Sequence, residues 1–220
     1  MEDNEPVAGY GATRRSLHTV AEHVLAAALH RATGRIGLRP TPGGFGTPWF
    51  GARRVRVEGV DLVVEDAGAV RRAPLVTVGE AAAFAGVEPG APVDVYAPTT
   101  PLAPDAPLDL DPAAAGTVHE WFRCTGEALA AFQAEVADRA PTEAQLWPEH
   151  FDLALVAGEA NFGGSPGDDG HPTPYAYVGP WSRDGLVGEY WNEPFGASRS
   201  LRDLDGPEGI LAFFREGLLE

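Results

Sequence analysis

The apolar positions between residues 16 and 33 recur with the period of an α-helix. Ser16 can cap the first turn, and Gly34 is a residue type that ends helices. One face of this helix collects the apolar side chains of Leu17, Val20, Ala21, Val24, Leu25 and Ala28. His18 falls at the edge of that face, whereas His23 and His30 fall on the opposite, polar face. We therefore expect His18 to be more buried than the other two histidines.

The pattern changes to that of short strands between residues 35 and 72. Within residues 53–58, RRVRVE, charged and apolar side chains alternate with the two-residue period of a half-buried strand. Segments of strand character also cover residues 35–39, 44–50, 60–65 and 69–72. We expect an antiparallel meander, in which the Gly- and Pro-rich stretch 40–50 forms an ordered loop and not a central strand.

A short helix with Thr77 and Glu80 at its start and Gly86 at its end precedes a proline-rich segment. Its prolines recur at every third position, the period of a polyproline II helix, at Pro98, Pro101, Pro104 and Pro107. We expect residues 97–110 to form a stiff, extended crossover on the surface, without helix. A ligand for a Pro-recognition domain is the alternative, but the segment has no flanking arginine.

Asp111 and Pro112 are a favoured N-cap and first residue of a helix, which we expect to run from about 112 to 138. Its buried face consists of Ala114, Val118, Trp121, Phe122, Thr125, Ala128, Leu129, Phe132 and Val136. Cys124 lies off the edge of this face in the middle of the helix, so packing explains it better than nucleophilic reactivity. A last helix begins near Asp205.

These elements predict an α+β fold: a single domain with a mainly antiparallel sheet, an N-terminal helix, the long central helix and a C-terminal helix. We expect residues 1–13 to be flexible and residues 14–220 to form the domain. The alternative organisation has two lobes that are hinged at the crossover of residues 97–110.

Composition narrows the classes of function. The net charge is −16, and all 16 basic residues are arginine. Nucleic-acid binding requires cations that replace condensed counterions, so we expect no nucleic-acid partner, and an anionic membrane surface is equally disfavoured. No apolar run approaches the roughly 20 residues that span a bilayer. Cys124 is the only cysteine, and the acidic N-terminus differs from a secretory signal, so we expect a cytoplasmic protein.

Chemically active side chains concentrate between residues 145 and 181. Residues 149–157 have the alternation of a strand, with Phe151, Leu153 and Leu155 on the core side. His150 and Asp152 would then share the other side, about 7 Å apart. In that position the aspartate can orient the histidine, or both can bind one metal ion. The alternative is a buried, purely structural His–Asp pair.

The loop that follows contains the pattern G-x-S-x-G at residues 163–167. A nucleophile elbow uses the backbone N–H after the serine, and Pro166 has none, so we reject the elbow. Ser165 is kept only as a candidate catalytic residue beside His150 and Asp152.

The same loop, NFGGSPGDDGH at residues 161–171, is rich in turn-forming residues and can fold back toward the strand. It lacks the spacing of a calcium loop. His150, Asp152, Asp168 and His171 would then offer nitrogen and oxygen ligands for zinc or another divalent ion.

Aromatic residues follow the loop at high density. Asn161, Tyr175, Tyr177 and Trp181 are candidates for binding a small molecule, because such sites combine aromatic rings with a few polar groups. The same aromatic residues are equally compatible with an ordinary core.

Several segments resemble an uncharacterised family of proteins from high-GC actinobacteria. They are SLHTVAEHVL, ATGRIGLRPTPGGFGTP, LWPEHFDLA, NFGGSPGD, PYAYVGPW and WNEPFGA. The early Leu-His helix and the late FDLA strand are also similar to a wider family of domains of unknown function. The resemblance covers most of the chain after residue 14 and implies a single bacterial cytoplasmic domain. It implies no catalytic residue, because neither family has an established activity.

Two functions are compatible with these observations. The first is a small-molecule enzyme, in particular a hydrolase assisted by a divalent metal such as zinc, with its site at the HFD strand and the 161–171 loop. The second is a non-catalytic binding or scaffold protein, in which the same residues are structural.

Overall fold

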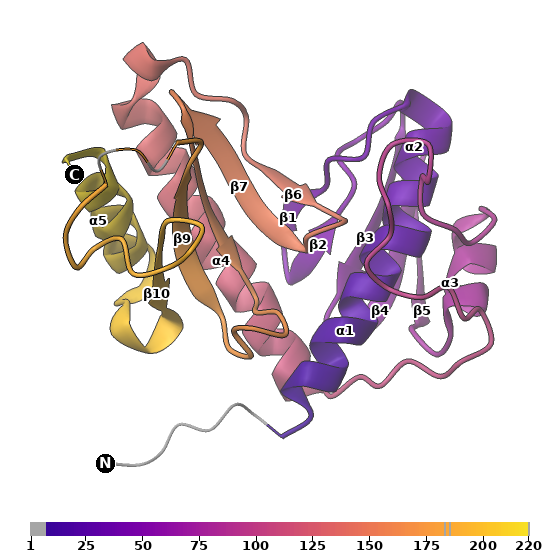
Figure 1. Cartoon of the computed structure of the whole chain (residues 1–220). Helices are drawn as coiled ribbons and strands as arrows, with labels where there is room; N and C mark the ends of the chain where they lie inside the picture. Colours follow the sequence, from indigo (N-terminus) through magenta and orange to yellow (C-terminus); the bar gives the residue numbers. More distant parts are fainter. Residues whose placement is uncertain (1–7, 183, 185, 220) are drawn as a thin grey trace. The chain divides into compact units, whose positions relative to one another are not determined.

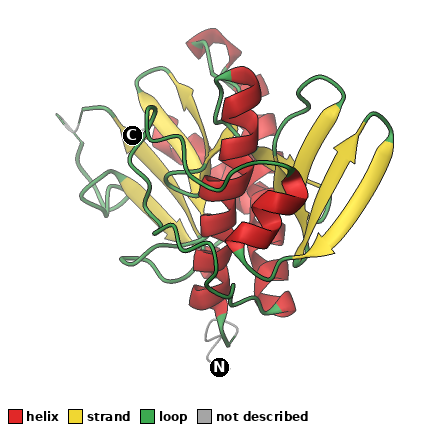
Figure 2. Cartoon of the chain, turned by 90° about the vertical axis from the view of Figure 1, so that its right-hand side faces the viewer, coloured by secondary structure: helices red, strands yellow, loops and turns green. Residues whose placement is uncertain are grey.

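The structure is a computed structural model that describes residues 8–182, 184 and 186–219. Its fold is α+β, as the sequence predicts, with two antiparallel five-stranded sheets and helices before, between and after them in the chain (Figures 1 and 2). The packing divides the chain into two compact units. The first contains the chain up to Glu120 and also Trp147–Phe151; the second contains Trp121–Leu146 and the chain from Asp152 onward. The division therefore falls after residue 120 and not in the proline-rich crossover.

The N-terminal helix of the first unit has three parts: α1 (Tyr10–Val20), the π-helical segment η1 (Ala21–Ala26) and α2 (Ala27–Thr33). It begins six residues before Ser16, so the expected flexible segment is wrong for residues 10–13, while residues 1–7 lie outside the described part. Tyr10 and Thr13 are buried, and this burial explains why helix forms without a side-chain cap. Gly34 ends α2 in the left-handed conformation, as expected.

The expected order of histidine burial is confirmed for His30 and wrong for His23. His23 is 1% exposed, whereas the side chains of His18 and His30 are 13% and 21% exposed. The π-helical segment has more residues per turn than an α-helix, so it changes the direction of the side chains that follow. His23 is also covered by the crossover: its Nδ1 accepts a hydrogen bond from the Ala91 N–H, and its Nε2 donates to the Thr100 carbonyl.

The first sheet has the order β1-β2-β3-β4-β5, which confirms the meander. Its strands are β1 (Arg39–Thr41), β2 (Gly44–Gly46), β3 (Arg53–Glu58), β4 (Asp61–Asp66) and β5 (Ala69–Pro74). The expected loop at 40–50 is wrong for β2, which pairs with both β1 and β3. A Cβ at Gly44 would overlap the Val57 carbonyl, and one at Gly46 would overlap Arg56, so glycine allows this close pairing.

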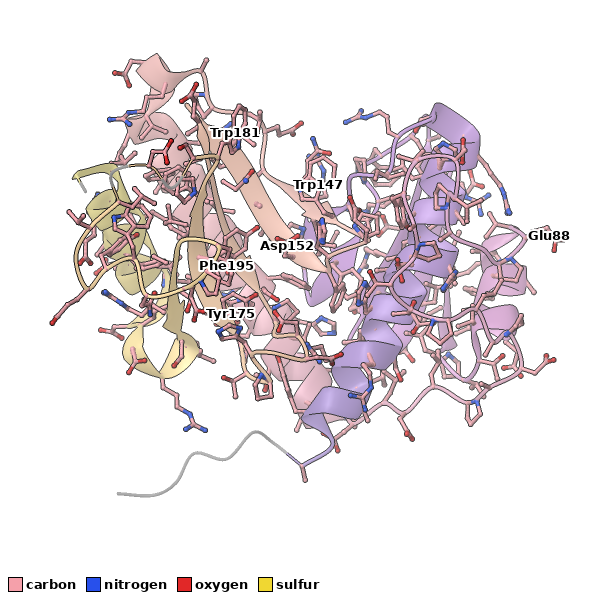
Figure 3. All side chains as sticks on the ribbon, viewed as in Figure 1. Glu88, Trp147, Asp152, Tyr175, Trp181 and Phe195 are labelled. Carbon is pink, nitrogen blue, oxygen red and sulfur yellow. The ribbon has the colours of Figure 1, made fainter. Side chains whose placement is uncertain are left out.

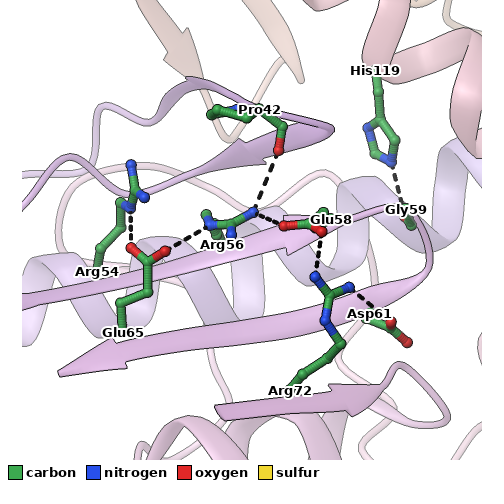
Figure 4. A network of polar contacts seen from close by, with 9 residues as sticks. All are labelled: Pro42, Arg54, Arg56, Glu58, Gly59, Asp61, Glu65, Arg72 and His119. Atoms are coloured by element: carbon green, nitrogen blue, oxygen red, sulfur yellow. Dashed lines mark hydrogen bonds and ion pairs between the residues drawn. The ribbon is translucent and has the colours of Figure 1, made fainter. Parts of the chain in front are cut away.

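One face of this sheet carries a network of charged side chains (Figure 4). Glu65 accepts from Arg54 at 2.6 Å and from Arg56 at 3.3 Å. Arg72 bridges Glu58 and Asp61, the latter at 3.0 Å. The charged positions of the alternating pattern are therefore paired across strands, which stabilises the register of the meander.

A short helix and an irregular crossover complete the first unit. Helix α3 (Val78–Ala85) is capped by Thr77, whose hydroxyl accepts from the Glu80 N–H, and Gly86 ends it, as expected. Residues 97–110 contain no helix, which confirms that part of the prediction, but bends at Thr99 and Thr100 and a turn at residues 104–106 interrupt the expected extended chain.

Helix α4 (Pro112–Glu135) begins where the sequence predicts and is followed by the 3-10 turn η2 (Ala137–Arg139). The Asp111 carboxylate caps it by accepting from the N–H groups of Ala113 and Ala114, each at 2.9 Å. All nine residues of the expected buried face are buried.

The second sheet has the order β10-β9-β8-β7-β6. Its strands are β6 (Gln145–Trp147), β7 (Asp152–Ala157), β8 (Ala160–Ser165), β9 (Tyr175–Pro180) and β10 (Ala197–Ser200); η3 (Leu201–Asp203) and α5 (Gly206–Leu219) follow. One face packs on α4 and α5, with Phe162 at 4.5 Å from Phe132 and 5.9 Å from Phe214 between ring centroids. The opposite face carries polar and aromatic side chains.

Candidate functional site

The strand that was expected to begin at residue 149 and to present His150 begins three residues later. Strand β7 starts at Asp152, and Phe151 has a left-handed backbone, with φ of 52°. The Phe151 ring is 2% exposed and packs against His18 and Phe45 at 5.1 and 5.3 Å, which offsets the strained backbone. His150 is consequently exposed in a turn of the first unit, so its expected place on the strand beside Asp152 is wrong.

Asp152 is held by a tyrosine from two strands away. Its Oδ2 accepts a hydrogen bond from the Tyr177 hydroxyl, and the aspartate is 8% exposed. Gly163 lies opposite Tyr177 on the intervening strand, and a Cβ there would be 2.7 Å from the tyrosine oxygen. Burial raises the pKa of Tyr177 well above its ordinary value, and the Asp152 charge adds to this effect. Tyr177 is therefore a protonated donor and not a base at neutral pH.

A second pair of the same kind lies beside the first. The Tyr175 hydroxyl donates to Asp168 Oδ2 at 2.7 Å, and Asp168 Oδ1 accepts from the N–H groups of Gly170 and His171 at 2.7 and 2.8 Å. Burial alone would raise the pKa of Asp168, but these hydrogen bonds outweigh it and hold the pKa below its ordinary value. The Asp168 carboxylate therefore stays ionised, and its side chain is 48% exposed.

His171 connects this pair to a third carboxylate. Its Nε2 donates to Glu193 Oε1 at 2.9 Å, its Nδ1 lies 3.9 Å from Asp168 Oδ1, and its side chain is 33% exposed. The Ser198 hydroxyl donates to the same glutamate oxygen at 2.8 Å. Burial raises the pKa of Glu193, but the hydrogen bonds from His171 and Ser198 outweigh it, so this carboxyl also titrates below its usual range.

Aromatic rings join these groups into one surface of the second unit, which we call the tyrosine–acid face. Its residues are Asp152, Asp168, His171, Tyr175, Tyr177, Glu193 and Phe195. The His171 ring centroid lies 4.7 Å from Tyr175 and 6.3 Å from Phe195, and Tyr177 lies 6.4 Å from Phe195. Figure 3 shows Asp152, Tyr175 and Phe195 on one side of the second unit. Glu193 and Phe195 are not among the residues that the sequence predicts, although the segment that contains them, YWNEPF at 190–195, is rich in aromatic residues.

The other candidates have different places. Ser165 is 4% exposed; its hydroxyl accepts from the Gly167 N–H at 3.0 Å and also forms a hydrogen bond with the side chain of Tyr175, its partner in the β8–β9 register. Asn161 lies at the far end of β8, where its amide donates to the Gly179 carbonyl at 3.5 Å. Trp181 is 64% exposed and lies apart from Tyr175 (Figure 3). Of the four residues expected to bind a ligand, the structure brings together Tyr175 and Tyr177.

The four expected metal ligands do not form one group. Within the described ranges, no set of three or more His, Cys, Asp or Glu side chains is arranged to hold a metal ion. Asp168 and His171 are neighbours, Asp152 is bound to Tyr177, and His150 belongs to the other unit. The chemistry that this surface offers is that of ionised carboxylates, protonated tyrosines and one accessible imidazole.

Comparison with known proteins adds no assignment. No family model, no curated protein and no solved structure matches the chain. In the part of the chain that the structure describes, no helix combines the length and the apolar character needed to cross a membrane.

Proposed function

We propose that the tyrosine–acid face binds a small organic cation. Asp168 is the observation that carries this proposal. It is a half-exposed carboxylate with a lowered pKa, and its hydrogen bonds come from a tyrosine hydroxyl and two backbone N–H groups, which are uncharged donors. Its negative charge is thus fixed in place and is not cancelled by an arginine among these donors.

The surrounding rings favour an organic cation. The faces of aromatic rings attract cations, and this attraction is worth about 0.5–2 kcal/mol for each well-placed ring. Phe195, which is 40% exposed, lies with His171 and Tyr175 around the two ionised carboxylates. A net charge of −16 attracts cations to the chain in general and repels anions. An ammonium group with apolar substituents matches both features of the surface.

Choline and its uncharged isostere 3,3-dimethylbutan-1-ol test the proposal by calorimetric titration. The chain should bind choline at least about tenfold more tightly, because one charge interaction of about 1.4 kcal/mol corresponds to tenfold in affinity. Asp168→Asn should remove that preference. Asp138→Asn, which removes an exposed charge from η2 in the same unit, is the matched control and should keep it. Equal binding of the two probes would contradict the proposal.

Phe195→Leu tests the aromatic contribution separately. Leucine keeps the apolar area but has no ring face, so choline affinity should fall while binding of the neutral isostere stays the same. A loss of affinity for both probes would indicate a packing role of Phe195 instead.

His171 supports a second candidate function, acid–base catalysis on a small molecule. Its Nε2 donates to an ionised glutamate, so in the neutral ring Nδ1 is the acceptor that can take a proton from the water that attacks an ester. A panel of carboxylic and phosphoric esters tests this function. Turnover by the wild type that is lost in His171→Gln and kept in the exposed control Asp138→Asn would support it. Turnover that survives His171→Gln would refute it.

Both candidate functions imply the same cellular location and the same class of partner. The proposal includes a cytoplasmic location and no nucleic-acid partner, which are supported by the acidic composition and by the single cysteine.

A further inference from the structure

The first unit contains a groove of about 690 Å³, and none of its lining residues belongs to the tyrosine–acid face. This volume lies within the roughly 300–1,000 Å³ of small-molecule sites. Its walls are small apolar residues of two helices, Ala28 and Ala32 from α2 and Ala83 from α3, together with the ring of Phe50. Two arginines, Arg31 and Arg53, and one glutamate, Glu88, also line it. We propose that this groove binds a small carboxylate that has an apolar body.

The two guanidinium groups are fixed at the groove by backbone carbonyls. Arg31 Nη1 donates to the Glu88 carbonyl at 2.6 Å, and Arg53 Nη2 donates to the Ala85 carbonyl. A guanidinium has five N–H groups in one plane, so each arginine keeps further donors after these bonds. Such donors match the two oxygens of a carboxylate. Because the carbonyl bonds already restrict both side chains, ligand binding would cost little additional side-chain entropy.

The charged groups around the groove determine whether the ligand is an anion or a cation. Helix α3 ends here, and the partial negative charge of a helix C-terminus disfavours anions. Arg53 binds the last carbonyl of α3, which offsets this effect, and Asp66, 3.5 Å from Arg53, has a side chain that is 51% exposed and hence well solvated. Figure 3 shows the Glu88 side chain directed outward, away from the helices. The charged residues of the lining are therefore Arg31, Arg53 and Glu88, and two of the three are cationic.

The lining also indicates the shape of the ligand. Alanines from α2 and α3 leave a smooth apolar wall, and Phe50 offers a ring for stacking. A flat aromatic or short alkyl acid can bury its body on this wall while its carboxylate meets the guanidinium groups. A fully hydrated inorganic anion would gain nothing from the apolar wall.

Benzoate is the probe, and benzyl alcohol is the uncharged comparison. Titration of each into the full chain is followed by backbone amide shifts in two-dimensional NMR, with Gly86 and Val87 as reporters because they line the groove. Benzoate should cause saturable shifts at these amides, and benzyl alcohol should bind at least about tenfold more weakly, as expected for loss of a charge-assisted hydrogen bond.

Two variants test the two parts of the site. Arg31→Gln removes one charge from an exposed side chain and should weaken benzoate binding about tenfold. Ala83→Leu fills the groove from an exposed position on α3, keeps both charges, and should weaken both probes. Arg15→Gln, an exposed arginine on α1 outside the lining, is the matched control and should bind like the wild type.

Any of four results would overturn the inference. Three of them are the absence of saturable shifts with benzoate in the wild type, equal affinity for benzoate and benzyl alcohol, and equal weakening by Arg31→Gln and Arg15→Gln. Shifts that saturate at amides outside the groove would place the acid elsewhere and would overturn it as well.

Discussion

Replacement of His18 by glutamine should make the protein less sensitive to acid. The His18 ring stacks on Phe151 with an interplanar angle of 9°, and its Nε2 donates to the Pro148 carbonyl at 2.8 Å. Burial lowers the pKa of His18 to about 4, and the nearby Glu22 charge opposes this only in part. The folded chain therefore holds a neutral imidazole at a pH where the unfolded chain is already protonated.

The magnitude follows from the two pKa values. The ordinary value is 6.5 and the folded value is about 4, a difference of about 2.5 units, or about 3 kcal/mol at about 1.4 kcal/mol per unit. Below 6.5 the unfolded state binds a proton that the folded state does not, so stability falls as the pH decreases toward 4. Below about 4 both states bind the proton. The loss of stability caused by His18 has then reached its full value and no longer changes with pH.

Urea unfolding at pH 7 and pH 4.5 measures the effect in the wild type and in His18→Gln. The glutamine amide can still donate to the Pro148 carbonyl but does not titrate. The loss of stability on acidification should therefore be about 2–3 kcal/mol smaller in His18→Gln than in the wild type. Arg15→Gln, an exposed change on the same helix, controls for general weakening of α1 and should follow the wild type. Equal acid sensitivity of wild type and His18→Gln would refute the view that His18 is buried and neutral.

Three further substitutions have directions that the packing defines. Gly163→Ala should cost about 1–3 kcal/mol in urea unfolding, because its Cβ would lie 2.7 Å from the Tyr177 oxygen and 2.8 Å from the Ala154 Cβ; no loss would contradict the crossing of Tyr177 over β8. Gly116→Ala, on α4 where the added Cβ meets no atom within 4 Å, should stabilise by up to about 1 kcal/mol, measured in the same way. Glu22→Gln should cost about 3 kcal/mol and speed amide exchange at Thr99 and Thr100, because this fully buried carboxylate accepts from both N–H groups, at 2.9 and 2.7 Å. Unchanged exchange there would show that Glu22 does not hold the crossover.

The parts of the fold that the sequence predicts well depend on local chemistry. Asp111 and Pro112 start a helix because a carboxylate accepts the free N–H groups of the first turn and proline lacks an N–H that would need one. The alternation in residues 53–58 predicts a strand because one side of a sheet is apolar and the other polar. Both signals involve neighbours in the chain, so one sequence is enough to read them.

The errors arise where distant segments decide the local conformation. His23 has the position of a solvated residue on an ideal helix, but the π-helical segment and the crossover near Thr100 bury it. His150 has the position of a strand residue, but the burial of the Phe151 ring pulls the backbone into a left-handed turn. In both cases contacts between residues more than 70 positions apart outweigh the local periodicity. Such contacts cannot be predicted from the periodicity of one segment.

The tyrosine–acid face shows which sequence signal can predict a site of this kind. Its residues come from two strands, β7 and β9, and two loops, and glycines allow them to meet. Gly163 makes room for Tyr177 to reach Asp152, Gly167 turns the chain with φ of 106° before Asp168, and a Cβ at Gly196 would overlap the Val178 carbonyl beside Phe195. Glycine is costly inside strands, so a glycine in a strand next to acidic and aromatic residues indicates that another group occupies the space of its side chain. That criterion selects Gly163 in β8, between the strands that carry Asp152 and Tyr177, without any catalytic motif.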